Sequence, residues 1–225
     1  MPSAPVAMRV ARVRASHRDP SVVLVDVEGA GTYRLSAETT GRFSLREGAD
    51  VDAALLGRIA SAASIREGTQ AALRLLQRRL RSRAELSAGL RRRGLSPPLV
   101  TVVLSNLERD GWIDDRRFAR LWVKDRMALR PRGARALRAE LRVRGIAPDI
   151  IEATLGGLVS SGVEDAAALD QARRRAERLR ALPPDVARRR LVGWLQRRGF
   201  NGGAITRALR SLADPDEEGT NAGSA

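Results

Sequence analysis

Cysteine is absent from the 225-residue sequence, and histidine and lysine each occur only once. The lack of cysteine excludes disulfide bonds and thiolate zinc sites. A single histidine removes most of the nucleophile–base pairs that enzymes use, so we expect no catalytic centre, no metal site and no cofactor. His17 itself stands at the polar end of a predicted strand, where we expect a solvated turn residue.

Long apolar runs are missing as well. The opening residues, MPSAPVAMRV, lack the apolar segment of a signal peptide, and no later stretch is apolar enough to span a membrane. We therefore expect a cytoplasmic protein that has no membrane partner. We also expect it to be a monomer.

Basic residues greatly outnumber acidic ones in only one part of the chain. Residues 1–67 hold 9 basic and 8 acidic residues, whereas residues 68–212 hold 32 basic and 14 acidic ones, a net charge of +18. So basic a region indicates a polyanion or an acidic protein surface as partner. Arginine suits bidentate contacts to phosphate or carboxylate, although codon bias in a GC-rich genome also explains arginine in place of lysine.

The basic region contains one sequence pattern three times, at 87–107, 138–158 and 192–212. Each copy is anchored on a glycine, and these glycines are Gly94, Gly145 and Gly199. Leucines stand eight and four residues before the glycine, an arginine directly precedes it, and apolar residues follow it by one, six, ten and thirteen positions. Self-similarity at a period of about fifty residues predicts a stacked array of helical units.

The spacing also predicts the structure of one unit. Leucines four residues apart share a helical face. The arginines suit the negative end of the helix dipole, and the glycine suits the left-handed position that ends a helix. The next helix begins at once, because Ser96-Pro97, Ala147-Pro148 and Asn201 are typical capping or first-turn residues.

We predict a mainly α fold, with tandem three-helix repeats in a curved array after a small N-terminal antiparallel β-rich head at about 8–36. Two helices, 51–63 and 71–80, should join the head to the first repeat. The predicted domains are 1–67 for the head and linking helix, 68–112, 113–160 and 161–213 for the three repeats, and 214–225 for a disordered acidic tail.

An acidic cluster and three tryptophans allow more than one interpretation. Residues 108–115 include four acids, which as helix caps beside a turn need no metal, while a metal-dependent nuclease site is the less favoured alternative. We expect Trp112, Trp122 and Trp194 in the core rather than as platforms for nucleic-acid bases.

The arginines at the ends of the middle helices are the better candidates for function. Solvated helix ends that complement the dipole are one interpretation. Recurrence in three copies favours a second one, a basic ridge along one edge of the array that fits a long anionic object such as DNA or a protein filament. The candidates are Arg91, Arg92, Arg93, Arg142, Arg144, Arg197 and Arg198.

Three segments together resemble the RecX family of bacterial recombination regulators. They are RSRAEL at 81–86, RRRGL at 91–95 and GWIDDRRFAR at 111–120, and the resemblance extends over about residues 8–212. It implies a cytoplasmic, non-enzymatic protein that binds the RecA recombinase filament on single-stranded DNA. Binding in the filament groove would restrain strand exchange, ATP hydrolysis and the coprotease activity that belongs to the SOS response.

The resemblance transfers signature positions but no catalytic residues. We expect most of them to be structural, with Leu86 and Phe118 as core residues and four polar residues as caps, which are Ser82, Glu85, Asp114 and Asp115. The positions are Arg81, Ser82, Glu85, Leu86, Gly111, Asp114, Asp115, Phe118 and Ala119.

A sequence-independent DNA-binding protein is the alternative function, because phosphate contacts alone could use the same arginines. Direct contact with single- or double-stranded DNA is compatible with either function.

Overall fold

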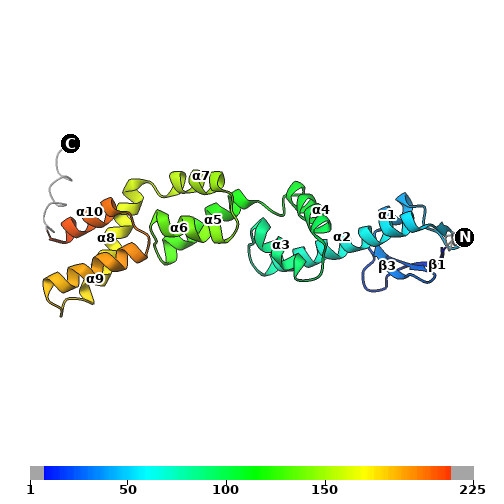
Figure 1. The fold of residues 1–225 in the computed structure, drawn as a ribbon, viewed down its shortest axis with the longest axis horizontal. Coiled ribbons are helices and arrows are strands. Elements are labelled where there is room, and N and C mark those ends of the chain that lie inside the picture. The colour runs from blue at the N-terminus through cyan, green and yellow to red at the C-terminus, as the bar shows by residue number, and fades with distance from the viewer. Residues whose placement is uncertain (1–7, 214–225) are drawn as a thin grey trace, which may run out of the picture. The chain divides into compact units, whose positions relative to one another are not determined.

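A computed structural model describes residues 8–213, which form two compact units, one up to Ile113 and one from Asp114 onward. Figure 1 shows a β-rich head followed by helices, and the predicted mainly α fold with three-helix repeats is confirmed. The predicted domain boundaries and the curvature of the array stay predictions. The acidic tail predicted at 214–225 lies outside the described residues.

The head is a four-stranded antiparallel sheet with the strand order β3-β2-β1-β4. Its strands are β1 Met8–Ala15, β2 Val23–Val27, β3 Gly31–Leu35 and the short β4 Asp50–Val51, with α1 at Ala37–Arg42. The predicted hairpin is confirmed, since Val27 pairs with Gly31 across a turn in which Gly29 has a φ of 71°. Ser36 caps α1 as predicted, and its side chain accepts a hydrogen bond from the Thr39 N–H.

One long helix, α2 at Ala53–Arg78, replaces the two helices predicted for 51–63 and 71–80. Its first half packs Ile59 against the sheet, and its second half packs Leu75 in the core of the first repeat. Gly68 lies inside α2, where a break was expected, and the side chains of Leu95 and Val103 occupy the place that a Cβ would take there.

The first repeat consists of α2, α3 at Arg83–Arg91 and α4 at Pro97–Arg109. Leu86 and Leu90, the leucines before the glycine, are fully buried with Leu104 from α4. The predicted leucine face is therefore confirmed as the core of this repeat.

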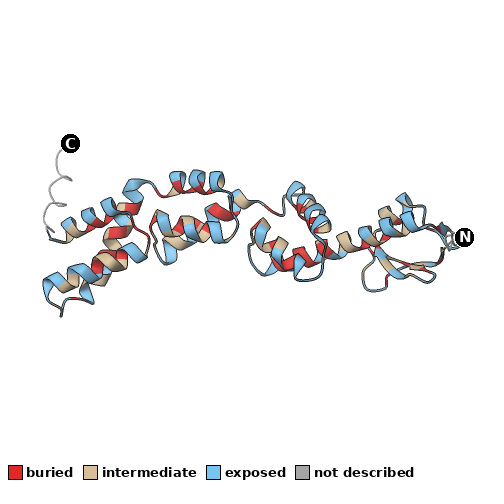
Figure 2. Ribbon diagram, in the orientation of Figure 1, coloured by how far each residue is buried: buried red, intermediate tan, exposed pale blue. Residues whose placement is uncertain are grey.

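The second unit contains the other two repeats, each with a core of its own. Their helices are α5 Asp115–Leu129, α6 Ala134–Val143 and α7 Pro148–Leu158, then α8 Ser161–Glu177, α9 Pro184–Arg197 and α10 Gly202–Ala213. Figure 2 shows the buried residues on the inward faces of these helices and exposed residues on the opposite faces. No helix among residues 8–213 is both long and apolar enough to cross a membrane.

Candidate functional site

The turn after the middle helix has the same geometry in all three repeats. Gly94, Gly145 and Gly199 have φ angles of 87°, 72° and 83°, in the left-handed region that favours glycine. The next residue donates a backbone hydrogen bond across the turn, as Ile146 does to the carbonyl of Leu141 at 3.1 Å. This Schellman arrangement confirms the predicted helix ends, and it fixes the backbone positions from which the neighbouring arginine side chains extend.

The arginine directly before each glycine is engaged within the chain. Arg93 and Arg144 turn back to donate to the carbonyl oxygens of Gly89 and Glu140, each at 3.0 Å. Arg198 donates to the carbonyl of Pro131 from Nε at 3.3 Å and from a terminal nitrogen at 3.2 Å. These three guanidinium groups therefore help to hold the helix ends.

The other candidate arginines are free of such contacts. Arg91, Arg92, Arg142 and Arg197 are exposed, and within residues 8–213 their side chains make no hydrogen bond or ion pair. The predicted set therefore divides into two groups. The inner arginines donate hydrogen bonds to backbone carbonyls, and they are Arg93, Arg144 and Arg198. The outer arginines face solvent without such bonds in the described chain, and they are Arg91, Arg92, Arg142 and Arg197.

Trp122 of α5 organises the inner arginine of the second repeat. The guanidinium carbons of Arg126 and Arg144 lie 4.1 and 3.5 Å from its ring centroid. Its Nε1 donates to the Glu140 carboxylate at 2.9 Å, and the same carboxylate pairs with Arg126 and Arg132. The half-buried ring therefore makes its cation–π contacts within the chain.

The other two tryptophans differ from each other. Trp194 is half-buried against the core of the third repeat, with Arg198 at 4.7 Å from the ring centroid. Trp112 is 60% exposed, so its predicted place in the core is wrong. Gly111, with a φ of 75°, ends α4 in another Schellman turn, and Trp112 is the residue that donates to the Leu107 carbonyl at 2.8 Å.

The first signature segment positions the start of α3. Ser82 is fully buried and accepts a hydrogen bond from the Glu85 N–H at 3.1 Å, as predicted. The Glu85 carboxylate accepts from the Arg79 guanidinium at 3.0 and 3.2 Å. Arg81 donates to the Leu75 carbonyl at 3.2 Å, and burial together with neighbouring Arg79 lowers its pKa.

The second signature segment starts α5 and fills the core of the second repeat. Asp114 caps the helix by accepting from the Arg117 N–H at 2.9 Å, and Asp115 is the acidic residue of its first turn. Phe118 is 2% exposed and Ala119 is fully buried. Asp114 is therefore the predicted cap, whereas Asp115 is the first residue of the helix and not its cap. Ser96 makes no side-chain cap although it precedes Pro97.

The acidic residues at 108–115 interact with different partners. Glu108 pairs with Arg83 at 2.8 Å, and Asp110 pairs with Arg109 at 3.5 Å. No cluster of three or more histidine, cysteine or acidic side chains that could hold a metal ion occurs in the described part of the chain.

Sequence reasoning missed Glu164 of α8, which is 4% exposed. Its Oε1 accepts from the backbone N–H groups of Ala134 and Asn201 at 3.1 and 3.2 Å, and its Oε2 accepts from Asn201 Nδ2 at 2.7 Å. One carboxylate therefore fixes the starts of α6 and α10, in different repeats. Its partners lie 30 and 37 residues away, and no local pattern marks it.

Two glycines complete this joint between the second and third repeats. A Cβ on Gly133 would overlap the carbonyl of Gly199, and a Cβ on Gly199 would overlap Ala136. The Gly133 N–H donates to the Arg198 carbonyl at 3.1 Å across the same contact. The start of α6 thus rests directly on the turn after α9.

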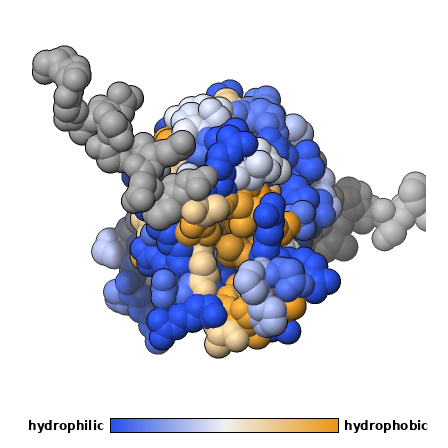
Figure 3. All heavy atoms as spheres, turned by 90° about the vertical axis from the view of Figure 1, so that its left-hand side faces the viewer, coloured by the Kyte–Doolittle hydropathy of each residue, from blue (hydrophilic) through white to orange (hydrophobic). Residues whose placement is uncertain are grey.

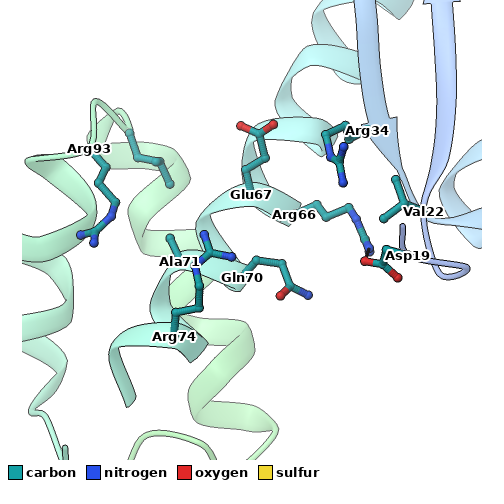
Figure 4. Close-up of a pocket in the computed structure, with 10 residues that line it drawn as sticks. Asp19, Val22, Arg34, Arg66, Glu67, Gln70, Ala71, Arg74 and Arg93 are labelled. Atoms are coloured by element: carbon teal, nitrogen blue, oxygen red, sulfur yellow. Dashed lines mark hydrogen bonds and ion pairs between the residues drawn. The ribbon is translucent and has the colours of Figure 1, made fainter. Parts of the chain in front are cut away.

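A cavity of about 430 Å³ lies where the head meets the first repeat (Figure 4). Arg66 reaches across it to Asp19 at 3.3 Å, and Ser21 hydrogen bonds lower the pKa of that carboxyl. Arg34, Arg74, Arg93 and Glu67 also line it. Its arginines are thus partly balanced by two acidic residues.

A second hollow, lined mainly by leucine and alanine, lies at the end of the third repeat. Figure 3 views this end of the molecule and shows apolar side chains bordered by hydrophilic ones. The leucines that line it are Leu179, Leu182, Leu191, Leu209 and Leu212.

The repeats match three family models in chain order. Residues 69–107, 114–155 and 163–209 match the models described as RecX, first, second and third three-helix domain. Together they cover more than half of the chain. The chain belongs to the RecX family.

Curated RecX proteins support the assignment. The protein named "Regulatory protein RecX" of Thermobifida fusca (strain YX) is 43% identical over 138 residues, 61% of this chain and 74% of that protein. The protein of the same name from Mycolicibacterium vanbaalenii is 40% identical over 147 residues, 61% of this chain and 79% of that one. The shared name supports a regulatory role.

Two solved RecX structures have the same fold. A crystal structure of regulatory protein RecX superposes with a TM-score of 0.77 at 19% identity and covers 90% of this chain and 99% of its own. RecX from Lactobacillus salivarius superposes with a TM-score of 0.62 at 23% identity, over 67% and 97% of the two chains. At these identities the match concerns the fold alone.

Proposed function

We propose that this RecX protein binds the RecA recombinase filament on DNA and modulates, mostly by inhibition, its recombinase, ATPase and coprotease activities. It would do so in the cytoplasm, as a monomer, by binding energy alone and without catalysis or a cofactor. Family membership supports the regulatory role, and the RecX resemblance suggests the partner.

The outer arginines are the observation that supports this proposal best. The same turn in each repeat leaves at least one guanidinium exposed and unpaired among the described residues: Arg91 and Arg92, then Arg142, then Arg197. A hydrogen bond to a charged group contributes about 1.5–3 kcal/mol, so a few such contacts would give tight binding. Acidic protein surface and DNA phosphate both occur on a recombinase filament.

The test is the inhibition of the cognate recombinase's DNA-dependent ATPase. Replacing Arg91 and Arg92 by alanine should raise the half-inhibitory concentration about tenfold or more, because two charge-assisted contacts are lost. Adding Arg142→Ala and Arg197→Ala should weaken inhibition further. Circular dichroism should show unchanged helicity, since these side chains lie outside the core.

Arg12→Ala with Arg18→Ala is the matched control, because it removes two exposed charges from the head. Its inhibition should stay close to that of the unmodified protein. Equal inhibition by the control and by the Arg91/Arg92 double variant would reject the outer arginines as the contact surface.

The alternative is sequence-independent DNA binding through phosphate contacts, which the net charge of +18 over residues 68–212 favours. The two functions separate when the protein is titrated at physiological salt against bare DNA and against recombinase-coated DNA. Tighter binding to the coated DNA supports the recombinase partner, and tighter binding to bare DNA supports the alternative.

A further inference from the structure

The second unit contains a cavity of about 460 Å³ between the end of α5, the C-terminal half of α8 and the end of α9. It therefore lies beside the joint that Glu164 and Gly133 hold together. Asp170 is its only acidic lining residue. Five arginines line it: Arg130, Arg174, Arg175, Arg178 and Arg198.

The protein itself balances only part of this charge. Arg174 pairs with Asp170 at 3.0 Å, and Arg198 donates to a backbone carbonyl. The side chains of Arg130 and Arg178 are exposed and make no hydrogen bond or ion pair with any other residue in the range 8–213. We call the five residues the cavity arginines.

Two half-buried arginines show the same imbalance. The Nε of Arg175 is inaccessible to solvent and has no hydrogen-bond partner within the described chain. Burial, together with neighbouring Arg132 and Arg130, lowers the pKa of Arg198. Like charges held together at a partly buried site repel each other, and an anion would relieve that repulsion.

The cavity near the head makes a useful contrast. There Arg66 already has Asp19 and Ser21 as partners, and Glu67 lies among the lining residues. The cavity of the second unit has five arginines for one carboxylate, which is already paired with Arg174. Its surplus of guanidinium groups points to an external anion rather than to an internal ion-pair network.

We propose that the cavity arginines bind the phosphodiester backbone of a nucleic-acid strand, as a direct contact separate from the outer arginines. A strand carries one charge for each nucleotide, so neighbouring phosphates can meet several guanidinium groups at once. A protein carboxylate delivers a single charge. The planar guanidinium also matches phosphate geometry through paired N–H donors.

Trp194 indicates that phosphates, not bases, are recognised here. The guanidinium carbons of Arg175 and Arg198 lie 5.7 and 4.7 Å from its ring centroid, so its ring is engaged with cations. A base would have to displace them in order to stack on it. Binding at this cavity is therefore independent of sequence and strongly dependent on salt.

The experiment measures the full-length protein by fluorescence anisotropy with a labelled oligothymidylate over a series of salt concentrations. Replacing Arg130 and Arg178 by alanine should weaken binding roughly tenfold or more, because two charge-assisted contacts are lost. The slope of log affinity against log salt should fall by about 1.4, which is 0.7 for each phosphate contact of a single strand.

Arg188→Ala with Arg190→Ala is the control, since it removes two exposed charges from α9, outside this cavity. Its loss of affinity should be at most about twofold, because exposed charges beyond contact distance are screened. Equal losses for the two double variants would overturn the proposal, because binding would then follow net charge alone. Circular dichroism checks that both variants remain folded.

Competitors separate a strand from a free phosphate compound. Inorganic phosphate and ATP should displace the oligonucleotide only at concentrations far above that of an unlabelled oligonucleotide. If the Arg130/Arg178 variant loses ATP binding but keeps oligonucleotide binding, the strand proposal is overturned. The same holds if the variant loses only its binding to DNA-free recombinase, since the anion would then be a protein carboxylate.

The anisotropy titration with the oligonucleotide contains no recombinase, so its failure and that of the function proposed above can be told apart. A variant that loses bare-DNA binding and still inhibits the recombinase ATPase would support the cavity and show that the inhibitory contact lies elsewhere.

Discussion

The first repeat and the third share one helix-ending turn but use it differently. Gly94 and Gly199 have φ angles of 87° and 83°, and a Cβ on Gly94 would meet nothing within 4 Å. A Cβ on Gly199 would overlap the backbone of Ala136, because the start of α6 rests there. The same motif thus ends a helix in one repeat and also joins two repeats in the other.

The inner arginines differ in the same way. Arg93 is exposed and donates a hydrogen bond to the Gly89 carbonyl. Arg144 and Arg198 lie over tryptophan rings, yet Trp122 comes from the first helix of its repeat and Trp194 from the middle one. Different neighbours therefore hold the guanidinium, although the arginine stands directly before the glycine in each repeat. This indicates that the turn, and not the tryptophan, is the repeated element.

The largest expected effect is the loss of stability on replacing these two glycines, and it compares Gly94 with Gly199. Gly94→Ala should destabilise the first unit by about 1–2 kcal/mol, the cost of a left-handed Cβ. Gly199→Ala should cost about 2–3 kcal/mol more in the second unit, because the steric overlap adds to the same conformational cost. Urea denaturation followed by circular dichroism measures both.

Gly156→Ala in α7 is the control, since a Cβ there meets nothing within 4 Å and the helix favours alanine by about 1 kcal/mol. It should be neutral or stabilising. Similar costs for Gly94→Ala and Gly199→Ala would mean that the contact with α6 contributes nothing.

A somewhat smaller effect is expected at the buried carboxylate of the joint. Glu164→Ala removes the acceptor of three hydrogen bonds at the starts of α6 and α10 and should cost about 3 kcal/mol. Glu164→Gln should cost less, because one oxygen remains to accept from the backbone. Glu177→Ala on the same helix removes a pair whose side chains are 76% and 82% exposed, and it should change stability by less than about 0.5 kcal/mol.

Local signals made most of the fold predictable. The glycine turns, the caps at Ser82 and Asp114, and the leucine faces depend on residues within a few positions of one another. The joint was not predictable, because Glu164 meets partners 30 and 37 residues away. The division of the candidate arginines into inner and outer ones was not predictable either, since adjacent positions such as Arg92 and Arg93 are identical in type and differ only in their contacts in the folded chain.

The smallest effect compares two tryptophans. Trp122→Phe keeps an aromatic ring but removes the hydrogen bond to Glu140 and weakens the cation–π contacts, so it should cost about 1–2 kcal/mol. Trp112→Phe alters a side chain that is 60% exposed and should cost less than about 0.5 kcal/mol. Thermal unfolding measures both, and equal costs would show that the Trp122 network adds no stability.

Helix α2 gives the first unit a mechanical property. Its 26 residues extend about 39 Å at 1.5 Å per residue, and it carries core residues of the sheet at one end and of a helical repeat at the other. A force applied to the sheet would therefore be transmitted to the repeat through a continuous helix, without first extending a flexible linker.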